Sequence, residues 1–377
     1  MTNIPKIIAL YLPQFHEIPE NNEWWGKGFT EWVTVKNAKK LFSKHNQPRV
    51  PYGDNYYDLS NIQTLKNQAD LMNKYGVDGL CFYHYWFKGK QVLEKPAEML
   101  LENKDIKMNF CFSWANETWK RTWYGYNKEI LLDQEYGEAK DWENHFNYLL
   151  NFFKDERYIK VDNSPVLVIY RTYDIDKFED MMTLFKNKAI ENGFNGIHII
   201  ETLTLKQKKI KSKLSNGCFF YEPGYNLLGL NNFKSLKRKI IYEIKKYIQK
   251  NIHKNNLLLN IYDYISFSKE ILKRNLTNIT ITKEQKINLG YFVNFDDSPR
   301  RKELGIIFKN STPNIFKHYL IKIIEKSIKI ESDFIFITAW NEWAEGAYLE
   351  ADTINGYGYL EKIIEAKNDI IIKANNI

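Results

Sequence analysis

The chain has 377 residues, 44% of them hydrophobic and 27% charged, which is the composition of an ordinary globular protein. Disorder, collagen and coiled coil are excluded. Lys and Arg number 54 against 46 Asp and Glu, so the net charge of +8 is modest for 45.0 kDa. Aromatic residues make up 15%. Aromatic rings stack on the apolar faces of sugars, so this richness fits carbohydrate binding and a large aromatic core equally well.

Eight short apolar runs rich in β-branched and aromatic residues predict strands. They read as near-continuous apolar segments, which is typical of parallel strands buried on both faces. The runs are Ile7–Leu12, Gly79–Tyr85, Asn109–Trp114, Val166–Tyr170, Gly196–Ile200, Gly217–Tyr221, Leu289–Phe295 and Asp333–Trp340.

Helical periodicity lies between most of these runs. It predicts helices over Asn61–Tyr75, Lys140–Phe153, Asp176–Asn192, Asn314–Lys329 and Tyr359–Lys373, whereas the link after Ile200 is only weakly helical. Strand and helix alternate in the way that predicts a (β/α)8 TIM barrel. An open doubly wound sheet is the competing fold, but it rarely needs eight units.

Two segments are longer than a barrel requires. Pro13–Ser60 is a long first βα loop rich in Trp, Pro and Asn, and residues 225–286 form a lysine-rich insertion with a mainly helical pattern. Without them the chain is close to the roughly 250 residues of a bare barrel. We therefore expect one catalytic barrel domain over residues 1–377 with two elaborations.

Catalytic groups of such barrels lie at the carboxyl ends of the strands, so the residues after each predicted strand are the candidate site. The strongest motif follows the last strand, where Glu342 and Glu345 are three residues apart between Trp340, Asn341, Trp343 and Gly346. If this segment is helical, the two carboxylates share a face. Cleavage of a glycosidic bond uses one carboxylic acid at the leaving oxygen and a second carboxylate at the sugar. A salt-bridged or capping pair is the structural alternative.

Other strand ends carry side chains suited to sugar contact. Trp114, Asn116 and Glu117 offer a ring, an amide and a carboxylate, although Asn116 could also cap a helix and Glu117 could lie on the surface. Trp24, Trp25 and Trp32 of the first loop either fold beneath it or line the rim of a cleft. His84 and Trp86 follow the second strand, and a lone His is more often structural than catalytic.

No cofactor or metal site is expected. The first strand lacks a Gly-x-Gly-x-x-Gly loop, no His-x-x-x-His spacing occurs, and Asp296-Asp297 beside Ser298-Pro-Arg300 predicts a hydrogen-bonded corner. Cys81, Cys111 and Cys218 are expected to be reduced core residues of a cytoplasmic protein, since no signal peptide pattern precedes the first strand.

The basic segment Lys234–Lys254 is amphipathic. It indicates either a solvated helix with one packed face or peripheral contact with a membrane or with polysaccharide-synthesis enzymes. No nucleic-acid partner is expected, because no motif for one is present.

Five motifs resemble the WbsX family of glycosyltransferases from bacterial polysaccharide gene clusters. That family carries a domain similar to the glycoside hydrolase family of endo-α-mannosidases. The matching segments are Ala9–His16, Glu23–Trp32, Gly79–Trp86, Phe112–Glu117 and Ala339–Glu350.

The resemblance implies a (β/α)8 barrel and a role for each glutamate. In the hydrolase relatives the residue matching Glu342 acts on the sugar 2-hydroxyl to form a 1,2-anhydro sugar. The residue matching Glu345 is the general acid and base at the leaving oxygen, and configuration is retained. Those relatives carry His where this sequence has Ala344, so the bound sugar is expected to differ.

The sequence thus predicts an enzyme of O-antigen or capsule metabolism that cleaves or transfers a glycosidic bond in an oligosaccharide or polysaccharide. Two alternatives stay open: a glycosyltransferase that uses an activated sugar donor, and a non-catalytic glycan-binding barrel. The absence of a Gly-rich phosphate loop argues against a nucleotide-diphosphate donor.

Overall fold

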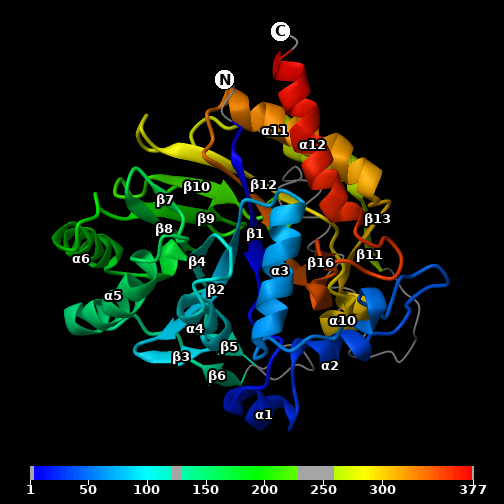
Figure 1. The fold of residues 1–377 in the computed structure, drawn as a ribbon, viewed down its shortest axis with the longest axis horizontal. Helices are drawn as coiled ribbons and strands as arrows, with labels where there is room; N and C mark the ends of the chain where they lie inside the picture. The colour runs from blue at the N-terminus through cyan, green and yellow to red at the C-terminus, as the bar shows by residue number, and fades with distance from the viewer. Residues whose placement is uncertain (1–3, 121–128, 228–258, 376–377) are drawn as a thin grey trace.

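The computed structural model describes residues 4–120, 129–227 and 259–375, and its centre is a closed barrel of eight parallel strands (Figure 1). In barrel order the strands are β1 (Lys6–Tyr11), β14 (Phe334–Thr338), β12 (Lys286–Phe292), β10 (Gly217–Phe220), β9 (His198–Leu203), β8 (Ser164–Ile169), β4 (Phe110–Trp114) and β2 (Gly79–Phe87). Pairing of β1 with both β14 and β2 closes the ring. The (β/α)8 prediction is confirmed.

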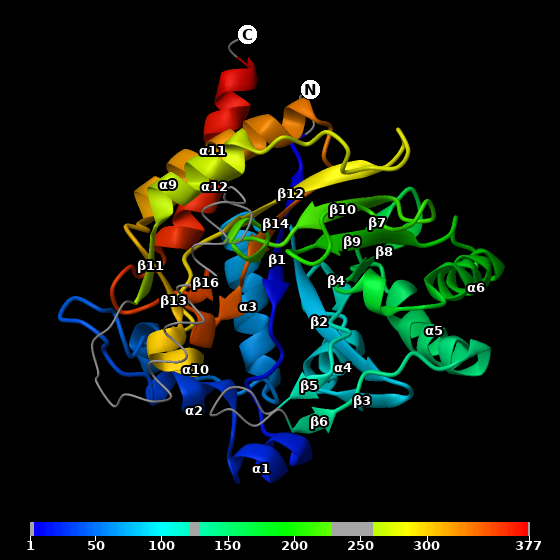
Figure 2. The same ribbon diagram turned by 180° about the vertical axis from the view of Figure 1, so that it is seen from behind.

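Helices follow most of the strands and surround the barrel (Figures 1 and 2). They are α3 (Ile62–Lys74), α4 (Lys95–Glu102), α5 (Ala139–Phe153), α6 (Phe178–Glu191), α9 (Tyr264–Lys273), α11 (Pro313–Lys329) and α12 (Gly358–Asn375). Each of the five predicted helices is present within two residues of its expected ends. The eight-residue helix α4 was not predicted, because it is too short to show a clear period.

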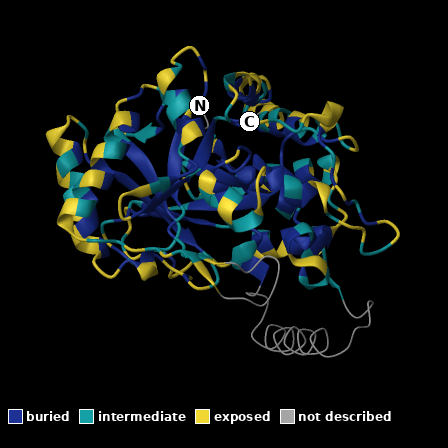
Figure 3. Cartoon of the chain, turned by 90° about the horizontal axis from the view of Figure 1, so that it is seen from below, coloured by how far each residue is buried: buried dark blue, intermediate teal, exposed yellow. Residues whose placement is uncertain are grey.

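Burial explains why the strands read as apolar runs. Every residue of β4, β9, β10 and β14 is buried, whereas the helices bury only their inner faces. Figure 3 shows this as dark strands inside a partly exposed outer layer. Packing between strands is tight enough to exclude a side chain at Gly290, where a Cβ atom would lie 1.7 Å from the carbonyl oxygen of Phe220.

No helix lies between β9 and β10, and a buried carboxylate holds this link instead. Glu201 in β9 has no exposed surface and accepts hydrogen bonds from the side chains of Thr172, Gln207 and Ser215. The backbone amides of Lys211 and Ser212 donate to the same carboxylate at 2.9 and 3.0 Å. Because this network fixes the chain between β9 and β10, no helix is needed there. This agrees with the weak helical pattern of the sequence after Ile200.

The described parts of the two long segments contain short helices and a strand of their own. The first loop contains two short helices, α1 (Pro19–Trp25) and α2 (Glu31–Lys36), at the end of the barrel opposite the chain termini (Figure 1). In the 225–286 insertion, α9 packs against α11, and β11 (Asn260–Asp263) pairs with β13 (Ile306–Lys309). The whole of the predicted basic segment Lys234–Lys254 falls in 228–258, outside the described residues.

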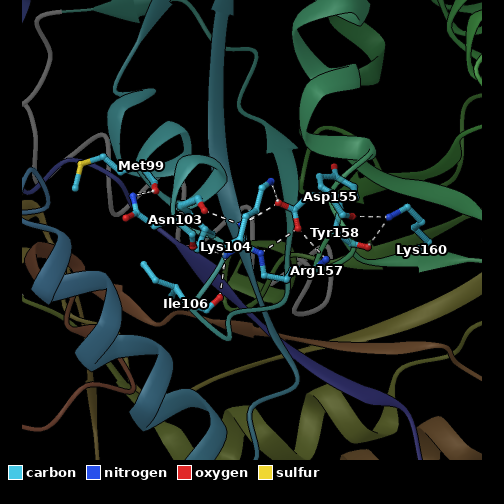
Figure 4. A network of polar contacts seen from close by, with 9 residues as sticks. Met99, Asn103, Lys104, Ile106, Asp155, Arg157, Tyr158 and Lys160 are labelled. Atoms are coloured by element: carbon cyan, nitrogen blue, oxygen red, sulfur yellow. Dashed lines mark hydrogen bonds and ion pairs between the residues drawn. The ribbon is translucent and has the colours of Figure 1, made fainter.

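A partly buried guanidinium joins the loops at the amino-terminal end of β4 and β8 (Figure 4). Arg157 donates to the carbonyl oxygens of Leu100, Asn103 and Ile106 and pairs with Asp155 at 2.8 Å. Asp155 keeps only 2% of its side chain exposed. Burial alone would raise the pKa of this carboxyl, but Arg157 and Lys104 lower it below its ordinary value. The network ties α4 and α5 to the bottom of the barrel.

Replacing Arg157 with Met should therefore lower the free energy of unfolding by about 3 to 5 kcal/mol, since a buried carboxylate and three carbonyl groups lose their main donor. Urea unfolding at pH 7 measures this change. Lys140→Ala is the control, because Lys140 is 79% exposed and its pair with Glu143 should contribute at most about 0.5 kcal/mol. Equal midpoints for the two variants would contradict the structural role of Arg157.

Candidate active site

The two glutamates lie in a tight turn directly after β14, at the carboxyl end of the barrel. The turn is a short antiparallel hairpin, β15 (Asn341–Glu342) and β16 (Ala347–Tyr348), connected by the single 3-10 turn η4 (Trp343–Glu345). Gly346 ends this turn with a φ of 59°. This backbone conformation favours glycine, and a Cβ atom on Gly346 would also lie 2.8 Å from Nη2 of Arg49, whose side chain would have to shift.

One guanidinium joins Glu342 and Glu345. Arg300 lies in the short helix α10 (Ser298–Arg301) after β12, and its Nη1 donates to Glu345 at 2.5 Å. Nη2 lies 3.4 Å from Glu342, and Nε and Nη2 contact the same oxygen of Glu31 at 3.0 and 2.7 Å. Three loops that are far apart in sequence thus meet at one cation. Glu342 and Glu345 therefore both contact the same guanidinium group.

Burial and like charge raise the pKa of Glu342 to about 8. Only 6% of its side chain is exposed, whereas 21% of the Glu345 side chain is exposed. Desolvation is the largest cause, the charge of Glu345 adds to it, and Arg300 opposes both. A buried pair of carboxylates near one cation therefore retains a proton near neutral pH.

Four tyrosines surround the glutamate pair. Tyr83 and Tyr85 come from β2, while Tyr170 and Tyr221 follow β8 and β10. The hydroxyls of Tyr83 and Tyr221 lie 3.5 Å apart, and the rings of Tyr170 and Tyr221 meet edge to face at 5.7 Å. Burial, and then the charges of Glu342 and Glu345, raise the pKa of all four phenols, so they remain neutral donors beside the carboxylates.

Glu350 holds the two tryptophans of the motif through hydrogen bonds to their indole nitrogens. Its two oxygens accept the indole N–H groups of Trp340 at 3.0 Å and Trp343 at 2.7 Å, and Tyr57 and Gln68 also donate to it. Trp340 and Trp343 are 0% and 1% exposed. The structure places these two predicted contact residues in the packed layer that supports the glutamates. Direct sugar contact by them stays a prediction.

Asn341 and Trp32 attach the first loop to this layer. The Asn341 side chain accepts from the backbone amide of Leu12 at 2.7 Å and donates to its carbonyl at 2.9 Å. Trp32 is 5% exposed, packs on Trp343 with ring centroids 5.4 Å apart, and donates to the carbonyl of Tyr57.

Of the three loop tryptophans, Trp32 folds beneath the loop, while Trp24 and Trp25 are half-buried. Trp24 packs against Trp119, and Trp25 against Phe29.

Asp296 forms the hydrogen-bonded corner that the sequence predicts. Its carboxylate accepts from Gln47 at 2.8 Å, pairs with His45 at 2.8 Å, and lies 3.7 Å from Arg49. Burial alone would raise its pKa, but His45 and Arg49 lower it. Its backbone amide also donates to the carbonyl oxygen of Glu345 at 2.6 Å. The corner therefore connects the first loop to the glutamate turn.

The predicted residues on β2 and β4 form a separate buried cluster. His84 contacts His145 of α5 through their Nε2 atoms at 2.9 Å, and Trp86 stacks on His145 at 4.6 Å. Trp114 is 1% exposed and lies edge-on to the same imidazole. Burial lowers the pKa of His84 to about 3, so this imidazole is neutral. The structure does not bring His84, Trp86 or Trp114 into contact with the glutamate pair.

Asn116 and Glu117 are both engaged with the loop after β8. The Asn116 amide accepts from the backbone amide of Arg171 at 2.8 Å and donates to its carbonyl and to Tyr136. Glu117 forms an ion pair with Arg171. Asn116 thus links two adjacent strand ends rather than capping a helix. Recognition of sugar hydroxyls by this pair stays a prediction.

Sequence reasoning missed Glu31, Arg300 and the tyrosines as members of the site. Arg300 lies 269 positions from Glu31, so no local spacing connects them. Both belong to motifs that the sequence singles out, Glu31 beside Trp32 and Arg300 after Asp296-Asp297. A signal was available, since a charged residue next to a conspicuous motif at a strand end is a candidate in its own right.

Three further observations concern the described part of the chain. Within residues 4–120, 129–227 and 259–375, no three His, Cys, Asp or Glu side chains are grouped as a metal site requires. No helix in those ranges is long and apolar enough to cross a bilayer. Cys81, Cys111 and Cys218 are buried and unpaired, as expected.

A (β/α)8 barrel with paired glutamates at the carboxyl ends of its strands is an arrangement typical of carbohydrate-active enzymes. The family model described as Glycosyltransferase WbsX matches residues 7–363. The chain belongs to this family. The resemblance seen in the motifs is thereby confirmed.

Known proteins resemble this chain in sequence and in fold. WxcX proteins from two strains of Xanthomonas campestris pv. campestris, B100 and ATCC 33913, are 30% identical over 96% of the chain. The chain spans 49% of their length. The GH99 endo-α-mannosidase of Bacteroides thetaiotaomicron shares the fold, with a TM-score of 0.59, 12% identity and 98% of each chain covered. A glycoside hydrolase-like protein has a TM-score of 0.57 at 13% identity, with 97% and 95% covered.

The raised pKa of Glu342 has a consequence for stability. Because its folded pKa of about 8 exceeds the ordinary value of 4.5, which applies in an unfolded chain, the folded protein binds more protons across that window. Stability should then fall as pH rises from 5 to 8, by up to about 1.4 kcal/mol per pH unit. Glu342→Gln removes this loss, so the free energy of unfolding of the variant should rise relative to that of the wild type as pH increases.

Urea unfolding at pH 5 and pH 8 measures the two slopes. Glu361→Gln is the control, because Glu361 is an exposed carboxylate on α12 and its removal leaves the buried pair intact. Parallel pH dependences for wild type and Glu342→Gln would show that Glu342 titrates normally.

Proposed function

We propose that the protein cleaves or transfers a glycosidic bond of an oligosaccharide or polysaccharide with retention of configuration, through Glu342 and Glu345. The observation that carries the proposal is the position of both carboxylates on one guanidinium at the carboxyl end of the barrel. Their unequal exposure supports different roles. Glu345 is the more open and suits the leaving oxygen, and Glu342 is the more buried and suits the sugar.

In the first step Glu342 takes the proton of the sugar 2-hydroxyl, and that oxygen attacks the anomeric carbon. The glycosidic C–O bond breaks as Glu345 gives its proton to the leaving oxygen. The products are a 1,2-anhydro sugar and the released alcohol. A base works best when its pKa lies near the working pH. With a pKa of about 8, Glu342 is ionised in only part of the molecules near neutral pH, so the reactive form is the one in which the proton of the pair lies on Glu345.

In the second step an acceptor hydroxyl attacks the anomeric carbon and opens the anhydro ring. Glu345 removes the proton of the acceptor, and Glu342 returns a proton to the 2-oxygen. Two inversions give net retention. Water as acceptor gives hydrolysis, and a sugar hydroxyl gives transfer. The family description as a glycosyltransferase favours transfer.

The substrate that best fits the family is a bacterial surface polysaccharide, O-antigen or capsule, or its precursor in the cytoplasm. Ala344 is fully buried between the two glutamates, at the position where the hydrolase relatives carry His. The smaller side chain supports a different sugar from theirs. The remaining predicted contacts, Trp24, Trp25, Asn116 and Glu117, are then candidates for outer parts of the glycan.

Replacing Glu345 with Gln should lower turnover of oligosaccharide fragments from the host surface polysaccharide by about 10²- to 10⁴-fold, because Gln cannot donate or accept the proton. Glu342→Gln should have a similar effect. Product analysis by chromatography and NMR, with and without an added sugar acceptor, separates hydrolysis from transfer. Glu361→Gln and the thermal unfolding of each variant are the controls.

Undiminished turnover by a folded Glu345→Gln variant would remove Glu345 from the mechanism. Saccharide binding with no bond turnover, unchanged in Glu342→Gln, would instead favour the non-catalytic glycan-binding barrel. Tight binding of a nucleotide sugar in calorimetry would favour a glycosyltransferase with an activated donor.

A further inference from the structure

The proposed mechanism gives no role to Glu31, although it is the most deeply buried of the three carboxylates on Arg300. Glu31 lies in α2 with no exposed surface, and one of its oxygens accepts two hydrogen bonds from Arg300. Its other oxygen is buried and has no hydrogen-bond partner among the described residues. Burying a carboxylate whose oxygens are not all hydrogen-bonded costs free energy. The position of Glu31 beside Arg300 therefore requires an explanation.

Arg300 reaches the glutamate pair because Glu31 holds it from the other side. Nε and Nη2 are engaged by Glu31, which leaves Nη1 directed at Glu345 and Nη2 within 3.4 Å of Glu342. A guanidinium held by two of its three nitrogens cannot rotate away. The side chain of Arg300 is 9% exposed, so solvent does little to screen these charges.

The balance of charge around Arg300 is unequal. Three carboxylates meet one cation, and full ionisation would leave two negative charges in a site almost closed to water. Burial opposes the charge on Arg300, but Glu31 first and then the two other glutamates raise the pKa of its guanidinium. Burial also raises the pKa of Glu31. Arg300 is therefore the fixed charge, and the carboxylates share the remaining protons.

We propose that Arg300 and Glu31 are positioning residues, in which Glu31 holds Arg300 against Glu342 and Glu345 and the two together set how the glutamate pair shares its proton. The roles of Glu342 and Glu345 in this proposal rest on the proposed function. The two positioning residues act in opposite directions. The cation favours ionised Glu342, and the third carboxylate disfavours it.

Other groups facing Glu342 do not change charge in the working range. Four phenols face it, all with raised pKa values, and they stay neutral between pH 5 and 9; they are Tyr83, Tyr85, Tyr170 and Tyr221. The charged groups that face it are Glu345 from η4, Arg300 from α10 and Glu31 from α2. Removing one of the last two isolates its effect on the pair.

The test uses the full-length protein without any sugar. Glutamate labelled with ¹³C at the side-chain carboxyl is incorporated, and the Glu342 signal is identified by its loss in Glu342→Gln. NMR titration between pH 4 and 10 then gives the midpoint for Glu342. We expect Glu31→Gln to lower this midpoint by about one pH unit or more, and Arg300→Met to raise it by a similar amount. Arg300→Lys keeps the positive charge but cannot contact several carboxylates at once as the guanidinium does. The Glu342 midpoint in this variant should therefore lie between those in Arg300→Met and the wild type.

Matched controls lie next to both residues. Glu23→Gln changes an exposed carboxylate of the same first loop, and Arg301→Met changes the neighbouring side chain, which is 58% exposed. Neither should move the Glu342 midpoint by more than a few tenths of a pH unit. If Arg300→Met fails to fold, Glu31→Gln and Arg300→Lys still test the opposite directions.

Midpoints that stay within those few tenths in folded Glu31→Gln and Arg300→Lys would overturn the proposal, as would shifts of the same sign. A structural role alone would lower stability without moving the two midpoints apart. Because no turnover is measured, failure here leaves the proposed function untouched. Conversely, full turnover by Glu345→Gln would refute the function even if the midpoints move as expected.

Discussion

The contact of one buried guanidinium with three carboxylates is the constraint on which the site depends. Arg300 joins Glu31, Glu342 and Glu345, and so fixes loops from the first, seventh and eighth βα units relative to one another. A buried ion cluster is weak as a source of stability, since desolvation offsets most of the attraction. Well-packed apolar residues would hold the loops equally well. The arrangement is better explained by a need for closely spaced carboxylates than by a need for stability.

Around this cluster, most other polar side chains form hydrogen bonds that hold the loops in place. Glu350 accepts the indoles of Trp340 and Trp343, Asn341 binds the backbone of Leu12, and Asp296 binds the first loop. These contacts cost adaptability but hold the glutamate turn to one geometry, which reactions at a sugar carbon require. The aromatic richness of the chain is explained largely by this supporting layer and by the core, and less by exposed stacking platforms.

The barrel could be predicted from sequence because each strand is buried on both faces and reads as an apolar run. The glutamate pair could be predicted because both carboxylates belong to one turn. Arg300 and Glu31 could not be joined to them, since their contact is made in space by loops 269 residues apart. His84, Trp86 and Trp114 follow strands as active-site residues do, yet they pack on His145 of α5. Position after a strand does not fix the direction of a side chain.

The charge of the cluster also bears on the kind of donor. Glycosidic cleavage passes through a sugar with oxocarbenium character, so a surplus of carboxylates over cations lowers its energy. A donor carrying a diphosphate would bring two or more negative charges next to Glu345 and Glu342, with Arg300 already shared among three carboxylates. The same excess of negative charge that favours the cationic sugar disfavours the diphosphate. If the protein acts as proposed, a neutral glycoside is therefore the donor that this arrangement of charges accommodates with least cost.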